Sequence, residues 1–336
     1  MKTHPKLYGM YYSVRRLARC YLRYLSLRKV INICRACLSM LFRKTHVRSL
    51  PFALKIESCS SCNLRCEGCR SGPGGHTYRP GKLRLEDLKR ILDEVGSTTV
   101  GITFYLWGEP MLNRQICDLV AEAHRRKIAT VISTNLHFLK PDVAEELVRA
   151  GLDLAIVAID GVTQEAYEEV RIGGDLNVAM ANLNLLVEAR RRVGRKRPII
   201  EWQYVVTEGN KGEMAEAQRI ARSLGVDVFT PLADWMARGE QEAEKAVQKA
   251  VKKHPHPACL WLWCAAAIQW DGEVFPCCHI ARYSKLTFGN CFEEELRSIW
   301  NNETYRLARQ RFRDRAERSD DGPTPCHRCF MRHGAF

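Results

Sequence analysis

The stretch "CNLRCEGC" at residues 62–69 follows the short apolar run "ALKI" at residues 53–56. The apolar run predicts a buried strand, and the loop after it holds three cysteines, with three and then two residues between them. Spacings this short let a turning backbone direct several sulfurs at one centre. Two thiols would indicate half a zinc site or a redox pair, and four would close a coordination shell. Three thiols leave one ligand position open.

After this loop, short apolar runs alternate with helical patterns. Repeated strand-then-helix units predict an α/β fold with a parallel sheet and outer helices. About six units that close partway would form an incomplete parallel (β/α)6-type barrel, with its working site at the carboxyl ends of the strands. The cysteine loop is expected at that rim. The expected strands are residues 53–56, 100–105, 128–133, 154–159, 199–206 and 226–229, and the expected helices are residues 84–95, 113–126, 141–150, 164–170, 177–192 and 212–224, with Gly151 and Gly225 as C-caps.

These patterns divide the 336 residues into four regions. Residues 1–51 are expected to form a basic, helical and amphipathic N-terminal extension, and residues 52–231 the α/β core. Residues 232–257, rich in Ala, Glu, Lys and Gln, are expected to form a helical connector. Residues 258–336 are expected to form a small cysteine-rich domain.

The net charge of +14 is concentrated at one end of the chain. Residues 1–54 hold twelve Lys or Arg and no Asp or Glu, and the charges of the remaining residues nearly balance. Arg15, Arg19 and Arg23 share one helical face, and the apolar runs are shorter than the about 20 residues that a spanning helix needs. Residues 1–50 therefore resemble an interfacial helix on an anionic membrane surface. The alternative is a pair of helices packed on the core with solvated arginines. No base-reading motif accompanies the charge, so nucleic-acid binding is not favoured.

Fifteen cysteines in tight groups favour metal ligation over disulfides. We find no signal-peptide pattern, so we expect a cytoplasmic protein in a reducing compartment. With the basic extension, peripheral attachment to the inner face of the membrane is the further expectation.

Four more motifs occur in order at the expected strand ends. They are "WGEP" at residues 107–110, "STN" at 133–135, "AIDG" at 158–161 and "TQEAYEEVRIGGD" at 163–175. Together with "CNLRCEGC", this set resembles the radical S-adenosylmethionine (SAM) superfamily over roughly residues 53–230. In that family three cysteines hold a [4Fe–4S] cluster, and SAM chelates the open iron. Reductive cleavage of SAM then yields a 5′-deoxyadenosyl radical, which abstracts hydrogen from a substrate.

The resemblance assigns roles to particular residues. It implies that Cys62, Cys66 and Cys69 bind the cluster and are catalytic. A zinc site completed by Cys59 or His76 is the alternative, and Gly68 departs from the bulky residue that the family often has before its third cysteine. The residues implied in SAM binding are Gly108, Glu109, Pro110, Ser133, Thr134, Asn135, Asp160 and Arg171.

A second cysteine region begins at Cys259. The pattern C-x12-G-x4-C leads from Cys259 to Cys277, and "CHRC" follows at residues 326–329. This region resembles the SPASM extension of radical SAM enzymes, which holds auxiliary [4Fe–4S] clusters. One auxiliary cluster is implied, and a small zinc ribbon is the alternative. "DGEVFPC" predicts a β-hairpin that presents Cys277. The implied cluster ligands are Cys259, Cys277, Cys326 and Cys329, with Cys264, Cys278 and Cys291 left as buried free thiols.

For the reaction, the resemblance implies an oxidoreductase in which the auxiliary cluster helps to oxidise or epimerise a substrate radical. A flavodoxin-type or ferredoxin-type protein would supply the reducing electron. The resemblance implies sugars, cyclitols or peptides as substrate classes, and the basic extension favours a lipid-linked one, so the expected substrate is a sugar, a cyclitol or a lipid-linked molecule. The alternatives are a peptide-modifying enzyme and a non-enzymatic iron–sulfur or zinc protein.

Overall fold

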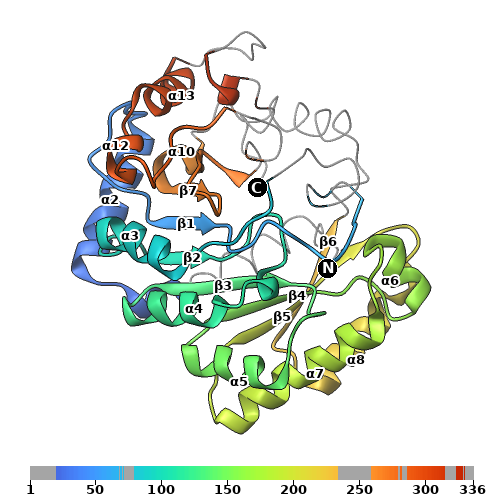
Figure 1. Ribbon diagram of the computed structural model, residues 1–336. Coiled ribbons are helices and arrows are strands. Elements are labelled where there is room, and N and C mark those ends of the chain that lie inside the picture. Colours follow the sequence, from blue (N-terminus) through green and yellow to red (C-terminus); the bar gives the residue numbers. More distant parts are fainter. Residues whose placement is uncertain are drawn as a thin grey trace, which may run out of the picture. The chain divides into compact units, whose positions relative to one another are not determined.

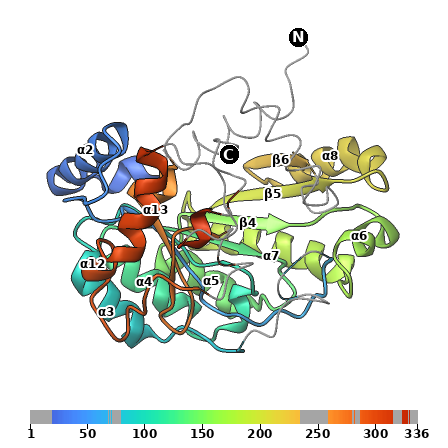
Figure 2. The same ribbon diagram turned by 90° about the horizontal axis from the view of Figure 1, so that it is seen from above.

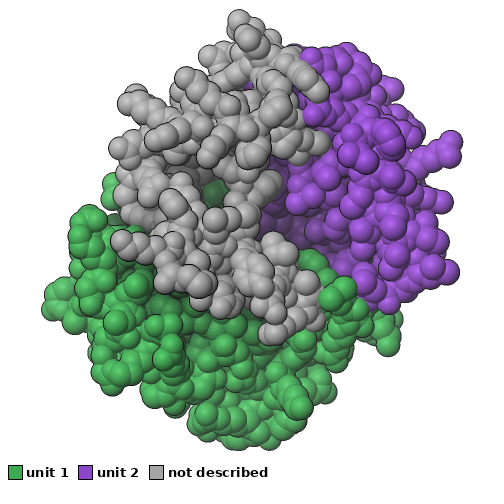
Figure 3. Space-filling model, turned by 180° about the vertical axis from the view of Figure 1, so that it is seen from behind, with its two compact units in different colours: residues 1–24, 57–85, 103–237 green, residues 25–56, 86–102, 238–336 purple. Residues whose placement is uncertain are grey.

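The computed structural model describes residues 20–67, 69, 71, 79–233, 259–278, 281, 286–314, 323–327 and 329. The chain forms two compact units, which Figure 3 distinguishes by colour. Unit 1 comprises residues 1–24, 57–85 and 103–237, and unit 2 comprises residues 25–56, 86–102 and 238–336. Each unit therefore combines stretches that are distant in sequence.

Unit 1 contains a parallel sheet in the strand order β6-β5-β4-β3. The register pairs Val131 with Leu154, Ile156 with Glu201, and Gln203 with Thr230. Because the strands are parallel, their carboxyl ends meet at one edge of the sheet. The strands are β3 (Ala129–Thr134), β4 (Leu154–Ala158), β5 (Ile199–Val206) and β6 (Val228–Ala233); β2 (Gly101–Thr103) precedes them in the chain.

Helices connect these strands, as the alternating pattern predicts. In Figures 1 and 2, α4, α5 and α7 lie on the same side of the strands of unit 1, and α5 packs against both of its neighbours. The helices are α4 (Ile116–Arg125), α5 (Pro141–Ala150), α6 (Gln164–Val170), α7 (Leu176–Val193) and α8 (Met214–Leu224), with the short 3-10 helices η1 (Leu22–Tyr24), η2 (Pro110–Leu112) and η3 (Lys211–Glu213).

The first described residues of the chain belong to the core of unit 1. Cys20 and Tyr24 pack in one buried cluster with Val131 of β3 and Leu154 of β4. The Tyr24 hydroxyl lies 3.0 Å from His124 Nδ1 and donates a 3.3 Å hydrogen bond to Asp153. Residues 20–24 are thus held by both apolar and polar contacts to the α/β core.

Unit 2 brings the second cysteine region beside the first strand of the chain. β1 (Ala53–Ile56) runs parallel to β7 (Ala265–Ile268), and β8 (Val274–Phe275) pairs with β7 in the antiparallel sense. The pairing of Ala53 with Ala265 joins positions that are far apart in the sequence. The other elements are α2 (Leu27–Leu41), α3 (Leu85–Val95, of which all but Leu85 falls in unit 2), α10 (Leu260–Cys264), α12 (Leu296–Ile299), α13 (Glu303–Arg313) and η4 (Pro325–His327).

The α/β class with a mostly parallel sheet is confirmed. The expected bounds of β1, β5, α5 and α6 match the structure, whereas β6 begins two residues later than expected and continues to Ala233. Gly151 and Gly225 are left-handed C-caps, as expected. The predicted hairpin is β7–β8, with Gly272 at a φ of 89° in its turn.

Several predictions fall outside the described residues. They concern Arg15, Arg19, Gly68, His76 and nearly all of the connector at residues 232–257. In the part of the chain that the structure describes, no helix has the length and apolar character needed to cross a membrane.

Candidate active site

The cysteine loop of unit 1 is partly withdrawn from water. Cys66 is buried, Cys62 and Cys69 are half-buried, and the backbone N–H of Cys69 donates to the Cys66 carbonyl at 3.2 Å. The backbone N–H of Leu64 lies 3.4 Å from the Cys62 sulfur, in a position to donate to it. Burial raises the pKa of Cys62 to about 12 and also raises the pKa of Cys66. Since clusters bind thiolates, binding here must release these protons.

The loop packs directly against the "WGEP" segment at Gly108. A Cβ atom on Gly108 would lie 2.1 Å from the Cys59 carbonyl oxygen and 2.7 Å from the Ser61 carbonyl oxygen. The backbone N–H of Glu109 donates to the same Ser61 oxygen at 2.8 Å. Only glycine allows this close backbone approach, so Gly108 fixes the distance between the two segments.

Glu109, the residue before η2, connects the start of η2 to the end of β3. Its buried carboxylate accepts hydrogen bonds from the Thr134 hydroxyl at 2.7 Å, from the Asn135 backbone N–H at 2.8 Å and from the Met111 backbone N–H at 3.0 Å. Burial raises the pKa of Glu109, and these donors oppose the rise because they favour the ionised form.

Asn135 continues this network to the cysteine loop. Its side-chain amide donates a 2.8 Å hydrogen bond to Asn63 Oδ1 and lies 3.7 Å from the Cys62 sulfur. Its side-chain oxygen accepts from the His137 backbone N–H at 3.0 Å. The end of β3 therefore positions an amide donor beside one of the three thiols.

Arg171 makes the corresponding link from β4. Its Nε donates to Asp160 Oδ2 at 2.5 Å, and its Nη1 lies 4.0 Å from the Cys66 sulfur. Asp160 is fully buried and also accepts from the Val205 backbone N–H at 2.5 Å. Burial opposes the charge of Arg171, but Asp160, Cys66 and Tyr167 together more than offset this and raise the Arg171 pKa above its ordinary value. A fixed cation thus lies beside the cysteine loop.

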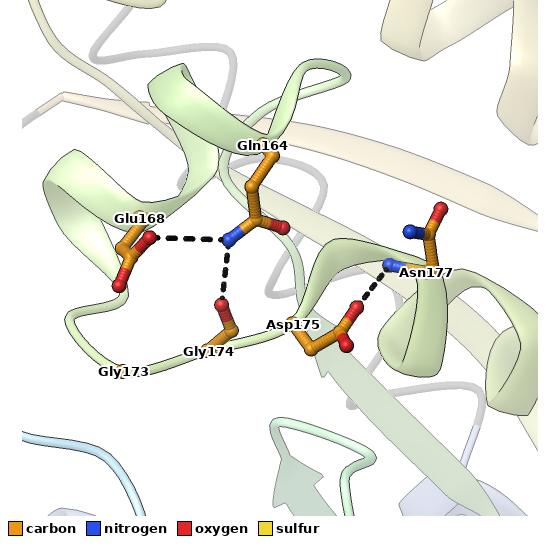
Figure 4. A pocket seen from close by; sticks show the side chains of 6 residues that line it. All are labelled: Gln164, Glu168, Gly173, Gly174, Asp175 and Asn177. Carbon is orange, nitrogen blue, oxygen red and sulfur yellow. Dashed lines mark hydrogen bonds between the residues drawn. The ribbon is translucent and has the colours of Figure 1, made fainter.

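The "RIGG" segment that carries Arg171 forms the edge of a surface pocket (Figure 4). Within this pocket of about 400 Å³, Gln164 Nε2 donates to the Gly174 carbonyl at 2.8 Å and to Glu168 at 3.3 Å. Asp175 caps α7 by accepting from the Asn177 backbone N–H at 2.8 Å. The Arg65 backbone N–H also donates to the Ile172 carbonyl at 3.0 Å. The Arg65 bond ties the "RIGG" segment to the cysteine loop, and the other bonds fix the conformation of residues 164–177. The lining residues are Gln164, Glu168, Gly173, Gly174, Asp175 and Asn177.

Unit 2 holds the second group of thiols. Cys326 is buried on η4, and the negative charges of Cys329 and Cys259 raise its pKa. Burial raises the pKa of Cys259 to about 11 and raises that of Cys326 well above its ordinary value. Cys277 follows β8. Its negative charge and that of Cys326 both raise the pKa of the buried Tyr305 hydroxyl. These electrostatic interactions relate the four predicted cysteines to the same part of unit 2, but no three of them converge on one point among the described residues.

Two arginines of α13 are buried, and one of them, Arg311, acts electrostatically on the thiol group. Arg311 is 2% exposed, and its positive charge partly opposes the rise in the Cys326 pKa. The Arg309 guanidinium lies over the rings of Trp300 and Tyr305 and donates to the Leu262 carbonyl at 2.8 Å. Burial lowers the Arg309 pKa to about 10. Positive charge is thus built into the side of the thiol group that α13 covers.

All fifteen cysteines are free thiols. Of the three spare ones in the second region, Cys264 is buried, as expected, whereas Cys278 and Cys291 are half-buried. No three His, Cys, Asp or Glu side chains among the described residues converge closely enough to hold a single metal ion.

Two family models match the chain at these sites. The model of the radical SAM superfamily matches residues 56–198, and the SPASM model, an iron–sulfur cluster-binding domain, matches residues 259–330. The chain contains a radical SAM domain followed by a SPASM domain. It is an enzyme of the radical SAM class, and its cofactors are SAM, a SAM-binding [4Fe–4S] cluster and an auxiliary cluster.

The names of the relatives of this radical SAM enzyme describe different functions. A tungsten-containing aldehyde ferredoxin oxidoreductase cofactor-modifying protein of Pyrococcus furiosus is 28% identical, over 75% of this chain and 81% of its own. The PqqA peptide cyclase of Granulibacter bethesdensis is 24% identical, over 84% of this chain and 80% of its own. Streptococcus suis SuiB, solved with its precursor peptide SuiA, superposes with a TM-score of 0.62 at 16% identity, over 82% of this chain and 70% of SuiB. The last similarity concerns the fold alone.

The radical SAM motifs lie where the sequence predicts them, at the ends of β1 to β4. The structure connects Glu109, Thr134 and Asn135 in one hydrogen-bonded network and joins Asp160 to Arg171. Ser133 and Pro110 lie on β3 and η2 without taking part in that network. The roles of these residues in binding SAM stay predictions.

The sequence interpretation missed several polar residues that support this radical SAM site. Asn63 lies between the first two cysteines, and its position inside the motif was the available signal. His137 and Asn210 had no such signal, because their partners are distant in sequence. His137 Nε2 accepts from the Asp175 backbone N–H at 2.8 Å, and Asn210 Nδ2 donates to the Asp160 carbonyl at 2.8 Å.

Proposed function

We propose that this radical SAM enzyme abstracts hydrogen from a peptide and oxidises it with the help of its auxiliary cluster. The name of the related PqqA peptide cyclase supports a peptide substrate, and SuiB, which shares the fold, was solved with its precursor peptide. They favour the peptide alternative over the sugar, cyclitol or lipid-linked substrate that the basic extension suggested.

The observation that carries this proposal is the presence of two unlike thiol groups in one chain. In unit 1, three cysteines lie beside a buried carboxylate, an amide and a fixed cation. In unit 2, the charges of Cys259, Cys329 and Arg311 act on the buried Cys326, and Cys277 and Cys326 both act on Tyr305. A group of three leaves one iron of a [4Fe–4S] cluster without a protein ligand, whereas a group of four closes the shell.

Within unit 1, each side chain has a proposed task. Cys62, Cys66 and Cys69 hold the cluster, which supplies the electron that cleaves SAM to the 5′-deoxyadenosyl radical. Glu109 receives the amino group of SAM, since a carboxylate can accept more hydrogen bonds than the three it makes here. Asn135 and Arg171 keep the cysteine loop in place through their contacts with the Cys62 and Cys66 sulfurs.

Within unit 2, Cys259, Cys277, Cys326 and Cys329 are the proposed ligands of the auxiliary cluster. A peptide carbon that has lost a hydrogen atom becomes oxidised by two electrons in total once it also loses one electron and one proton. A cluster held by these four thiolates would be able to accept that electron, and the proton would pass to solvent. A flavodoxin-type or ferredoxin-type protein is the proposed donor to the unit 1 cluster, and the fifteen free thiols favour a reducing, cytoplasmic location.

The first test is anaerobic reconstitution, followed by addition of dithionite and SAM. Formation of 5′-deoxyadenosine is expected from the wild type and not from a C62A/C66A/C69A variant. A C34A/C37A variant is the matched control, because these two cysteines lie exposed on α2. Iron content of about eight atoms per chain is expected, falling to about four when the four unit 2 cysteines are replaced by alanine.

The second test concerns the substrate. Short peptides encoded next to the gene would be incubated with the reconstituted enzyme and analysed by mass spectrometry. A product that is two hydrogens lighter, formed together with 5′-deoxyadenosine, is expected. Turnover with sugars, cyclitols or lipid-linked sugars, and none with any peptide, would contradict the peptide proposal while leaving the radical chemistry intact.

A small-molecule substrate is the second candidate. The name of the Pyrococcus relative describes modification of a cofactor. Its identity of 28% is above the 24% of the peptide cyclase. The same mass-spectrometric assay with a panel of small molecules separates the two candidates.

A further inference from the structure

Helix α2 has its polar and apolar faces reversed relative to a normal surface helix. Its buried side chains are Lys29, Asn32, Ala36 and Ser39, three of which are polar. Its exposed side chains include Leu27 at 78%, Leu41 at 72% and Leu38 at 53% exposure. A surface helix of a globular protein ordinarily turns its apolar side to the core. The orientation of α2 therefore requires an explanation.

Specific contacts within unit 2 fix this orientation. The side chain of Asn32 donates to the Leu50 carbonyl at 2.9 Å and accepts from the Leu50 backbone N–H at 2.9 Å. Ser26 caps the start of the helix by accepting from the Lys29 backbone N–H at 3.4 Å. The helix also packs against α10. Turning the apolar side inward would break the paired bonds of Asn32 and leave polar groups unsatisfied.

The exposed apolar residues form one continuous stripe. We call Leu27, Ile31, Cys34, Leu38 and Leu41 the α2 stripe; they are spaced alternately four and three residues apart. At about 100° per residue, the stripe lies roughly opposite the buried face. Val30 and Phe42, which are 40% and 66% exposed, widen it on either side.

Positive charge accompanies the stripe. Arg28 and Arg35 are exposed and follow one border of it, and Lys44 and Arg48 are exposed shortly after the helix. Residues 20–56 contain no Asp or Glu. An apolar face with a basic border matches a lipid surface, where apolar side chains enter the acyl region and cations remain among anionic headgroups.

We propose that the α2 stripe docks this enzyme onto an anionic lipid bilayer, with the helix lying in the plane of the surface. This proposal is independent of the substrate class. A second copy of the chain fits the stripe less well. Self-pairing would bring Arg28 and Arg35 of two helices together, and the helix itself has no acidic residue to neutralise them.

The test is vesicle flotation of the full-length, reconstituted enzyme. Vesicles of phosphatidylcholine alone are compared with vesicles that contain three parts phosphatidylcholine and one part phosphatidylglycerol. Wild-type enzyme should partition at least tenfold more strongly onto the anionic vesicles. An L38E/L41E variant should lose at least tenfold in partitioning onto them. An R28E/R35E variant should lose most of the preference for anionic lipid.

Two controls separate docking from misfolding and from dimer formation. Met214→Glu changes an exposed apolar residue of α8 and should partition like the wild type. All variants should keep their circular dichroism spectrum and iron content, because the substituted side chains are exposed. Unchanged partitioning of the L38E/L41E variant would overturn the proposal. A dimeric wild type that L38E/L41E converts to a monomer, with no vesicle binding by either, would assign the stripe to self-association instead.

Discussion

The Arg171 side chain joins the carboxyl end of β4 to the cysteine loop, with its Nε 2.5 Å from Asp160 Oδ2 and its Nη1 4.0 Å from the Cys66 sulfur. Asp160 is fully buried, so removal of the cation leaves a buried charge uncompensated. We expect Arg171→Gln to lower the free energy of unfolding by about 3 kcal/mol and to weaken SAM binding in calorimetry.

Arg149→Gln is the matched control for this substitution. It removes an ion pair with Glu145 in which Arg149 is 61% exposed. Exposed pairs contribute less than about 1 kcal/mol, so chemical denaturation should barely change. Equal losses of unfolding free energy in the two variants would show that the burial of Asp160 does not strengthen its ion pair with Arg171.

Gly108→Ala should disturb the cysteine loop. The new methyl group would meet backbone atoms at 2.1 and 2.7 Å, and backbone cannot move aside as a flexible side chain can. We expect a loss of about 1–3 kcal/mol in stability and a several-fold lower iron content after reconstitution.

Gly212→Ala provides the comparison for Gly108. A methyl group at Gly212 meets nothing within 4 Å. This substitution should leave iron content unchanged and, by restricting the unfolded chain, leave stability the same or slightly higher. Full iron incorporation by Gly108→Ala would show that the two segments can separate without harm to the site.

Lys29 makes the stability of the protein depend on pH. Burial lowers its pKa from 10.5 to about 8. Between about pH 8 and pH 10.5 the unfolded chain holds the proton and the folded chain has released it, so the Lys29 contribution to stability rises with pH over this window. At neutral pH the buried charge is a cost, and Lys29→Met should be more stable than the wild type by up to about 3 kcal/mol.

The measurement is chemical denaturation of both proteins at pH 7 and at pH 9.5. Other groups titrate in both proteins, so the difference between the two isolates Lys29. That difference should shrink at the higher pH. A difference that is constant with pH would show that the gain from methionine is a packing effect.

Arg311 should set the electron affinity of the auxiliary cluster. A cluster bound by four thiolates is anionic, and its reduction adds another negative charge, which a buried cation beside Cys326 favours. We expect Arg311→Gln to move the midpoint potential of the auxiliary cluster to a more negative value in a titration followed by electron paramagnetic resonance.

Arg313 lies on the same helix but is about half exposed and pairs with Asp314. Arg313→Gln should leave the potential of the auxiliary cluster unchanged, and the potential of the SAM-binding cluster should be unchanged in both variants. A shift of the same size in both arginine variants would indicate a general effect of net charge.

The sequence predicted the parts of the fold that depend on local patterns. β1 and β5 have the expected bounds because they are compact apolar runs, and Gly151 and Gly225 end helices because glycine tolerates a positive φ. The pairing of β1 with β7 could not be predicted, since no local pattern relates Ala53 to Ala265.

For the candidate site too, the sequence predicted individual motif residues but not the contacts between them. The motif residues Glu109, Asn135 and Arg171 could be named from the sequence, but their partners could not. That Glu109 accepts from Thr134, or that Arg171 reaches Asp160, depends on the spatial arrangement of strand ends. The sequence indicated a basic, amphipathic helical segment within residues 1–50, but it left open which face of that segment the fold buries.

Residues 20–24 of the N-terminal extension belong to the core of unit 1 and are not a separate appendage. Tyr24 reaches Asp153, and Cys20 packs with Val131 and Leu154, so these residues complete the interior of the catalytic unit. A chain shortened to begin at Phe52 would lose that filling and expose an apolar hollow to water. We therefore expect deletion of residues 20–24 to destabilise unit 1, so point substitutions are the better way to remove the surface properties of the extension.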